Sequence, residues 1–373
     1  MHRERSTFTA DGAVIEGFLD RVSDPSNSIR TQVLQCNTMY ELKTNREYTM
    51  KQLALAAAVA VASVGAVHAQ SLLSHEAVDF ATASPSGTWY PVAATLSEMT
   101  NEAFEGQPIS VVPAGGGVSN PLSVGTGQAG FGISYAPFLK LAQEGGNDMY
   151  AEGFPKLRAI AGMTWNALHI ITADDIDFPA ALAAGDPLVI GTGATGSTEQ
   201  FTMDEVLKAY DTTREGVTEA GGRVELLNTS GRSDGWSNRQ FDVVNFFISM
   251  PASAVTSLMT TRSDSRILDI EENVAQQMID DWGMGPITIP AGTYPNQDED
   301  ALTVGMPYVA FTTADMDEEI VYQMAKAAAE GQERLANTQS TFASWDPSKM
   351  MDGLGIELHE GAKRYYRERG WIE

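Results

Sequence analysis

Residues 81–91 have the composition of an anion-binding loop, because a short apolar run leads into small polar residues at what reads as a helix start. The N–H groups of a first helical turn have no partner inside the helix, and the helix dipole adds partial positive charge there. A loop of Ser, Gly and Thr lets an anion such as a carboxylate approach these groups. The residues expected at this site are Ser86, Gly87, Thr88, Trp89 and Tyr90.

The same layout returns 110 positions later, in residues 187–199. Thr82 and Thr88 of the first stretch correspond there to Thr192 and Thr198. An apolar strand again runs into a turn of small residues before a helix, and the expected contacts are Gly196, Ser197 and Thr198. Two such stretches predict two lobes that face one ligand.

Two further predicted strands end in small residues. The β-branched run 109–112 leads into a glycine-rich turn with Gly116 and Gly117, and a third run, 129–134, closes on Ser134. Parallel α/β sheets place ligands outside the carboxyl ends of their strands. The sequence therefore predicts a binding crevice along this edge of the sheet.

The first 69 residues are expected to stand outside the folded protein. Residues 1–49 show no helical or alternating period and hold the only cysteine, Cys36. Residues 50–69 combine a basic start, an apolar run and small residues before Ala69, which is typical of a signal peptide cleaved after that residue. The apolar run is too short and too rich in alanine for a good transmembrane helix. We expect Met50 to be the true start and the protein to be exported to the periplasm.

The composition of residues 70–373 excludes several classes of function. The predicted leader holds seven basic and seven acidic residues, so the net charge of −25 remains on the rest of the chain. Such a surface repels nucleic-acid phosphates and anionic lipids, and no nucleic-acid partner is expected. Without cysteine there is no thiolate metal site and no thiol catalysis.

The remaining pattern predicts an α/β fold. Residues 157–163 and 168–172 are predicted as two strands, and residues 173–186, rich in Ala, Asp and Pro, have the composition of a linker. We expect this linker to make the first crossing between lobes. The long apolar segment 302–311 is expected to carry the chain back.

Lobe I is thereby predicted to comprise residues 70–172 plus 300–373, and lobe II residues 173–299. Within lobe II, residues 228–238 are polar and contain glycine, which predicts a long loop that overhangs the crevice. A long amphipathic helix is predicted over residues 317–335.

Seven short motifs, in order, resemble the TAXI family of TRAP-transporter solute receptors. They are Ser-Gly-Thr-Trp-Tyr-Pro (86–91), Ala-Gly-Gly-Gly-Val-Ser-Asn (114–120), Gly-Gln-Ala-Gly-Phe-Gly (127–132), Gly-Ser-Thr-Glu (196–199), Phe-Asp-Val-Val-Asn-Phe-Phe (241–247), Thr-Val-Gly-Met-Pro (303–307) and Gly-Ala-Lys-Arg-Tyr-Tyr (361–366). The resemblance implies a type II periplasmic-binding-protein fold, with two α/β lobes joined by crossing strands and a ligand cleft between them. It also implies that the protein, which we expect to be a monomer, delivers a small solute to the membrane subunits of a sodium-driven TRAP transporter.

The resemblance assigns ligand contacts to the loop positions that match the family's binding regions. Two departures stand out: Gly130 occupies a position that is often acidic in the family, and the motif 196–199 is one residue shorter than the family's. The residues carried over are Ser86, Gly87, Thr88, Trp89, Tyr90, Gly116, Gly117, Ser134, Gly196, Ser197 and Thr198. With two helix ends for an anion and two aromatic rings for stacking, the expected solute is a small organic acid or an acidic amino acid.

Two enzymatic alternatives and a surface-interaction protein remain open. Residues 191–196 fit G-x-G-x-x-G, with Asp211 about 20 positions beyond the first glycine, so an NAD(P)-dependent oxidoreductase is the main alternative. For a hydrolase, His75, His169 and His359 lie far apart in the sequence without spaced metal ligands beside them. We therefore expect no catalytic residue, no metal and no cofactor.

Overall fold

The computed structural model describes residues 78–373 with the exception of 105 and 107. The predicted signal peptide, 50–69, and the predicted extension, 1–49, lie outside the described residues. Among the described residues, no helix is both long and apolar enough to cross a membrane.

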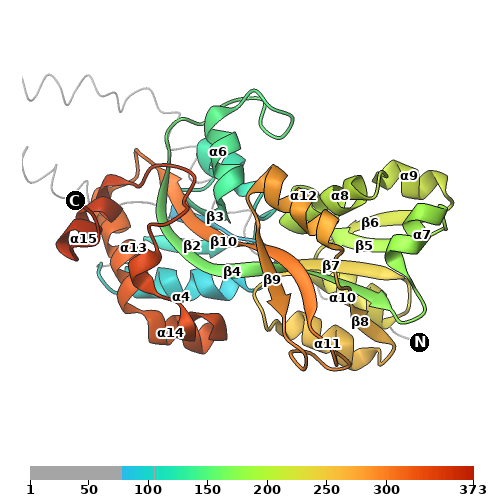
Figure 1. Cartoon of the computed structure of the whole chain (residues 1–373). Helices are drawn as coiled ribbons and strands as arrows, with labels where there is room; N and C mark the ends of the chain where they lie inside the picture. The colour runs from blue at the N-terminus through green and yellow to red at the C-terminus, as the bar shows by residue number, and fades with distance from the viewer. Residues whose placement is uncertain (1–77, 105, 107) are drawn as a thin grey trace, which may run out of the picture. The chain divides into compact units, whose positions relative to one another are not determined.

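One mixed sheet runs through the described chain (Figure 1). Its strands are β1 (Val78–Ala81), β2 (Ile109–Val112), β3 (Phe131–Tyr135), β4 (Leu157–Ala173), β5 (Val189–Gly193), β6 (Arg223–Leu227), β7 (Val243–Ile248), β8 (Ser265–Ile267), β9 (Gly285–Ile289) and β10 (Ala301–Thr313). The order is β2-β1-β3-β10-β4-β7-β5-β6, while β8 pairs with β4 and β9 with β10.

Helices cover both faces of the sheet. They are α4 (Trp89–Asn101), α5 (Asn120–Gly125), α6 (Ala136–Glu144), α7 (Phe178–Ala184), α8 (Thr198–Ala209), α9 (Arg214–Glu219), α10 (Thr229–Ser237), α11 (Ser253–Thr261), α12 (Glu272–Trp282), α13 (Glu318–Glu330), α14 (Gln332–Thr338) and α15 (Glu360–Glu368), with two short 3-10 turns, η1 (Ser340–Ser344) and η2 (Pro347–Lys349).

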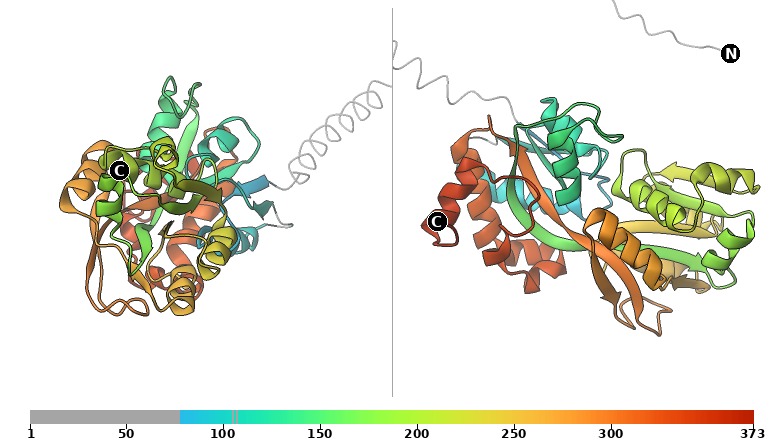
Figure 2. Two further views of the ribbon diagram at one scale, coloured as in Figure 1. Left: turned by 90° about the vertical axis from the view of Figure 1, so that its right-hand side faces the viewer. Right: turned by 45° about the horizontal axis from the view of Figure 1, so that its top comes forward.

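The elements gather into two groups along the sheet, which the views of Figure 2 show from two further sides. In the first group β1 pairs in parallel with β2 and β3, with α6 on one face and α4, α13 and α14 on the other. In the second group β5 pairs in parallel with β6 and β7, with α8 and α12 on one face and α10 and α11 on the other. Both groups thus present the carboxyl ends of parallel strands.

Two long antiparallel strands, β4 and β10, connect the groups. Their pairing runs from Gly305 with Ala167 to Thr313 with Leu157, and it shifts register on either side of Val309 and Ala310. The prediction of two separate strands at 157–163 and 168–172 is wrong, because β4 is continuous over 17 residues. The predicted return segment at 302–311 is confirmed within β10.

The predicted linker at 173–186 is also wrong, because it contains helix α7. Asp177 caps this helix, since its side chain accepts a hydrogen bond from the N–H of Ala180, and Gly185 ends it with a left-handed φ of 69°. The first crossing is therefore made by β4 itself. The exact division into lobes at 172 and 299 stays a prediction.

Two further predicted segments differ from the structure. The long helix expected over 317–335 divides at Gly331 into α13 and α14. The loop expected over 228–238 is helix α10, whose first turn is capped by the Asn228 side chain at 2.8 Å from the N–H of Gly231. Glycine and serine are poor helix formers, so buried Arg232 and Trp236 anchor this helix by packing.

Candidate functional site

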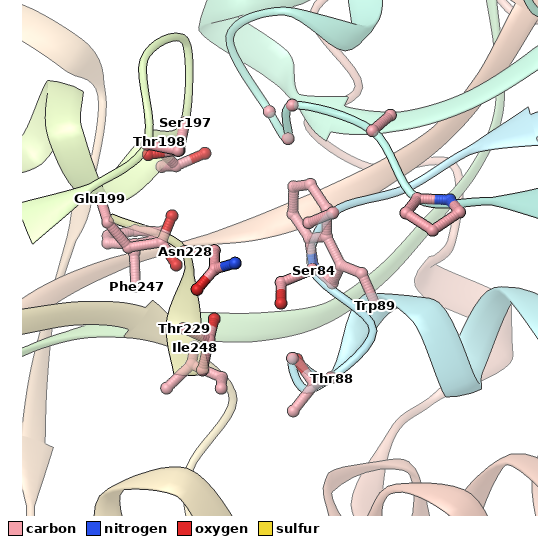
Figure 3. A pocket seen from close by; sticks show the side chains of 18 of the residues that line it. Ser84, Thr88, Trp89, Ser197, Thr198, Glu199, Asn228, Thr229, Phe247 and Ile248 are labelled. Atoms are coloured by element: carbon pink, nitrogen blue, oxygen red, sulfur yellow. The ribbon is translucent and has the colours of Figure 1, made fainter. Parts of the chain in front are cut away.

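A pocket of about 300 Å³ lies where the two groups of strand ends face each other (Figure 3). In Figure 3, Ser84, Thr88 and Trp89 stand on one wall and Glu199 and Asn228 on the other. The position matches the rule that α/β sheets bind ligands at the carboxyl ends of their strands. The lining consists of residues 83–85, 87–89, 113–117, Tyr135, Asn166, Ala194, 197–199, 227–229, Arg232 and 247–248.

Most of the predicted site residues meet in this pocket. Those that line it are Gly87, Thr88, Trp89, Gly116, Gly117, Ser197 and Thr198. They come from three strand-to-helix loops, after β1, β2 and β5, and these three loops were predicted from small residues at strand ends.

Four predicted residues do not line the pocket. Ser134 is buried and donates its hydroxyl hydrogen bond to the Gly117 carbonyl oxygen, so it supports a lining loop from behind. The Ser86 hydroxyl lies 3.0 Å from the Ser84 hydroxyl on the surface. Gly196 and Tyr90 lie beside lining residues without contributing to the wall themselves.

The first loop brings the N-terminus of α4 to the pocket. Its turn is closed by a hydrogen bond of 2.9 Å from the Gly87 N–H to the Ser84 carbonyl oxygen. Thr88 occupies the cap position of α4, yet its side chain makes no capping hydrogen bond. The Thr88 hydroxyl is thus not required by the helix.

The second loop is held in place by Asn120. The Nδ2 group of this buried side chain donates to the carbonyl oxygens of Thr82 at 2.8 Å and Ile133 at 2.9 Å, while its Oδ1 accepts from the N–H of Gly116 at 3.3 Å. One amide therefore joins the ends of β1 and β3 to the glycine loop. Gly116 has a φ of 100°, a conformation that favours glycine.

The third loop begins helix α8. Ser197 caps this helix, because its Oγ accepts a hydrogen bond from the N–H of Gln200 at 3.1 Å. That bond uses a lone pair of the hydroxyl and leaves its O–H as a donor. Asn245 of β7 supports the same turn by donating from Nδ2 to the Glu199 carbonyl oxygen at 2.8 Å.

Aromatic rings form the floor between the loops. The Tyr135 ring lies 5.2 Å from that of Trp89 and 5.3 Å, edge to face, from that of Phe247. Asn166 of the crossing strand β4 donates to the Tyr135 hydroxyl at 2.8 Å and accepts from the Ser249 hydroxyl at 2.7 Å. This floor joins both halves of the pocket.

Burial holds the pKa of the Tyr135 phenol well above its usual value. The hydrogen bond from Asn166 acts against this rise, and the nearby Glu199 carboxylate adds to it. The phenol is therefore neutral at physiological pH. The Glu199 carboxylate therefore lies close enough to the Tyr135 phenol to affect its pKa.

An ion pair between a buried arginine and a partly exposed glutamate lies in the wall of the second group. Arg232 Nη2 is 3.3 Å from Glu199 Oε1, Nη1 donates to the Leu227 carbonyl oxygen at 3.0 Å, and the guanidinium lies over the Phe246 ring at 4.5 Å. Burial lowers the pKa of Arg232, and Glu199 partly offsets this. The site prediction covered Arg232 only within the loop expected over 228–238 and did not select Glu199, although Glu199 directly follows the predicted Thr198.

Three buried polar atoms on lining residues have no hydrogen-bond partner among the described residues. They are Trp89 Nε1, Thr198 Oγ1 and Arg232 Nε, in residues that are 5%, 3% and 1% exposed. Unpaired buried donors are rare because each loses its hydrogen bonds to water. All three can donate, so a bound acceptor would satisfy them.

In the described part of the chain, the structure shows no cluster of metal ligands, and the histidines there make structural hydrogen bonds. No group of three His, Cys, Asp or Glu side chains there could hold a metal ion. His169 is fully buried between the Ala167 carbonyl oxygen and the Tyr294 hydroxyl, both at 2.9 Å. His359 caps helix α15 by accepting from the N–H of Gly361. His75 lies outside the described residues.

The G-x-G-x-x-G match does not form a complete strand-to-helix turn. Gly191 and Gly193 lie inside β5, and α8 begins only at Thr198. In a dinucleotide loop these glycines make the turn and let the backbone approach the pyrophosphate. Here a Cβ at Gly193 would lie 2.0 Å from Ser197 Oγ, so the lack of a side chain at Gly193 lets Ser197 pack against the strand end.

The chain belongs to the NMT1-like family, whose sequence model matches residues 80–370. Among solved structures, the chain is similar to MatC of Rhodopseudomonas palustris with bound malate, with 12% identity, a TM-score of 0.50, and coverage of 80% of this chain and 99% of that one. It is also similar to the periplasmic binding protein BugD, with 13% identity, a TM-score of 0.48, and coverage of 79% and 97%.

A third similar structure is the binding protein component of an ABC phosphonate transporter from Pseudomonas aeruginosa. It shares 10% identity, with a TM-score of 0.46 and coverage of 73% of this chain and 80% of that one. The likeness to MatC confirms the predicted fold class, a periplasmic-binding-protein fold in which two α/β lobes are joined by crossing strands.

Proposed function

We propose that this protein is an extracytoplasmic solute receptor that captures a small organic carboxylate between its lobes. The observation that carries the proposal is the pocket itself, where unpaired donors of Trp89, Thr198 and Arg232 meet the N-termini of α4, α8 and α10. Donors and positive helix ends suit an anion. Malate, the ligand bound in the similar MatC structure, is such an anion.

The working receptor is proposed to be a periplasmic monomer of the TAXI type that delivers its solute to the membrane subunits of a TRAP transporter. The motifs named above support this assignment. Uptake into vesicles that contain those subunits would then require both the receptor and a sodium gradient. N-terminal sequencing of periplasmic protein should begin at Gln70, and a chain that retains residues 1–48 would contradict export by this signal.

A thermal shift screen against small carboxylates tests solute binding directly, because a ligand that binds only the folded state raises the melting temperature. We expect at least one carboxylate of four to six carbons to raise it, and native mass spectrometry of protein purified without refolding to show a bound small acid. A flat screen together with empty protein in native spectra would overturn the proposal.

A further inference from the structure

The pocket wall carries only two charged side chains among the described residues, Glu199 and Arg232. Because they pair at 3.3 Å, their charges cancel and the wall has no net charge of its own. A second carboxylate on a ligand would therefore find no unpaired cationic side chain on this wall among the described residues. The absence of net charge on this wall therefore affects which carboxylates can bind in the pocket.

The side chains of Glu199 and Arg232 differ in how far they are exposed. The Arg232 side chain is 2% exposed, whereas that of Glu199 is 21% exposed. Arg232 is engaged by Leu227, Glu199 and the face of Phe246. Glu199 accepts a side-chain hydrogen bond through Oε1 alone among the described residues. The more accessible of the two charged groups is therefore the Glu199 carboxylate, while Arg232 offers only its unpaired Nε–H as a donor.

Two unpaired donors belong to residues that line the same pocket as this carboxylate. Thr198 Oγ1 precedes it in the same helical turn, and Trp89 Nε1 stands on the opposite wall. A ligand carboxylate can accept from these donors and from the helix ends, while a second ligand group meets Glu199. A negative second group would be repelled there, but a cationic donor would gain a charge-assisted hydrogen bond.

We propose that the solute is a zwitterionic amino carboxylate whose ammonium group binds Glu199. This inference rests on the proposed function, since it names the class of carboxylate that the same pocket selects. Arg232 acts here as a positioning residue that holds the Glu199 side chain and balances its charge.

Calorimetry with a series of matched five-carbon probes tests the proposal on the unmodified protein. The probes are 2-aminopentanoate, 2-hydroxypentanoate, pentanoate and glutarate, with four- and six-carbon sets beside them. We expect the amino acids to bind at least tenfold more tightly than the unsubstituted acids, and the dicarboxylates to bind most weakly. Pentanoate or glutarate binding as tightly as 2-aminopentanoate would overturn the amino-acid assignment while leaving the carboxylate receptor intact. If no probe binds, both proposals fall.

The variant Glu199→Gln tests whether Glu199 binds the ammonium group of the ligand. The amide keeps an acceptor for Arg232 but loses the charge, so the preference for 2-aminopentanoate over pentanoate should fall to less than about threefold. Glu272→Gln is the matched control, because Glu272 is an exposed acid in the first turn of α12, and it should keep the full preference. If Glu199→Gln does not fold, the double variant Glu199→Gln with Arg232→Met removes both charges and should show the same loss. An unchanged preference in the folded variant would overturn the role of Glu199.

Discussion

Ser119 donates its backbone N–H to the carbonyl oxygen of Gly196 at 3.1 Å, a hydrogen bond between the glycine loop after β2 and the loop before α8. These loops belong to the two different groups of strands. Near this bond, a Cβ placed on Gly116 would lie 3.6 Å from Ser197 Cα. The two groups are thus in direct contact beside the pocket, as expected of a closed receptor.

Gly117→Ala is expected to prevent this closure. A Cβ there would lie 2.4 Å from Thr198 Oγ1 and 3.1 Å from the Tyr135 ring, so the two loops would have to separate. Small-angle scattering should show a smaller radius of gyration when the parent binds its best carboxylate probe, and no such change in the variant. Gly216→Ala is the control, because its Cβ would also meet a threonine side chain, 2.5 Å from Thr212 Oγ1, but in helix α9, which does not line the pocket. Compaction of Gly117→Ala to the parental radius would contradict this view.

Thr88→Ala should weaken carboxylate binding without affecting stability. The Thr88 hydroxyl lines the pocket and caps nothing, and a hydrogen bond to a charged group contributes roughly 1.5 to 3 kcal/mol. This energy corresponds to a loss of affinity of about tenfold or more, which calorimetry with the tightest carboxylate probe should show. Thr88→Ser retains the hydroxyl and is expected to retain most of the affinity. Parental affinity in Thr88→Ala would remove this residue from the site.

Ser197→Ala should weaken both binding and stability. Ser197 lines the pocket and also caps α8, and the loss of such a cap costs about 1 kcal/mol of unfolding free energy. Urea unfolding should show this cost for Ser197→Ala and none for Thr88→Ala. Equal stability of the two variants would argue against the cap, and unchanged affinity would argue against contact with the ligand.

The sequence predicted the loops of the site better than its side chains. Small residues after β1, β2 and β5 could be recognised locally, and the topology of parallel strands brings their ends together. The pair of Glu199 and Arg232 joins residues 33 positions apart. No local pattern specifies such a contact, because it depends on how α10 packs.

The errors in secondary structure have physical causes. β4 was divided because its apolar pattern is interrupted near Trp165, which is 48% exposed where the strand crosses between the two groups. Helix α10 was missed because it is rich in Ser and Gly, whereas α7 was missed because the Asp, Gly and Pro residues around it outweighed its alanines. Their capping residues, Asp177 and Asn228, were the available signals.

Acidification should destabilise the protein through His169. Burial lowers the pKa of this imidazole from 6.5 to about 4. The unfolded chain therefore binds the proton more readily, and stability present above pH 6.5 is lost as the pH falls towards 4, by about 3 kcal/mol in total. Urea unfolding of the parent and of His169→Gln should diverge with pH, the parent losing more stability on acidification. A difference that is constant from pH 4 to pH 8 would exclude this linkage.

Asn120→Ala should remove both stability and binding, because this amide joins the glycine loop to the ends of β1 and β3. The variant leaves buried backbone groups unpaired, each at roughly 1 to 3 kcal/mol, and releases the loop that carries Gly116 and Gly117. Asn101→Ala is the matched control: Asn101 also bonds the backbone, at Ile109, but lies at the far end of α4. Urea unfolding should show a cost for both variants, whereas calorimetry with the tightest carboxylate probe should show lost affinity for Asn120→Ala alone. Equal losses of affinity would mean that binding follows overall stability and not the position of the glycine loop.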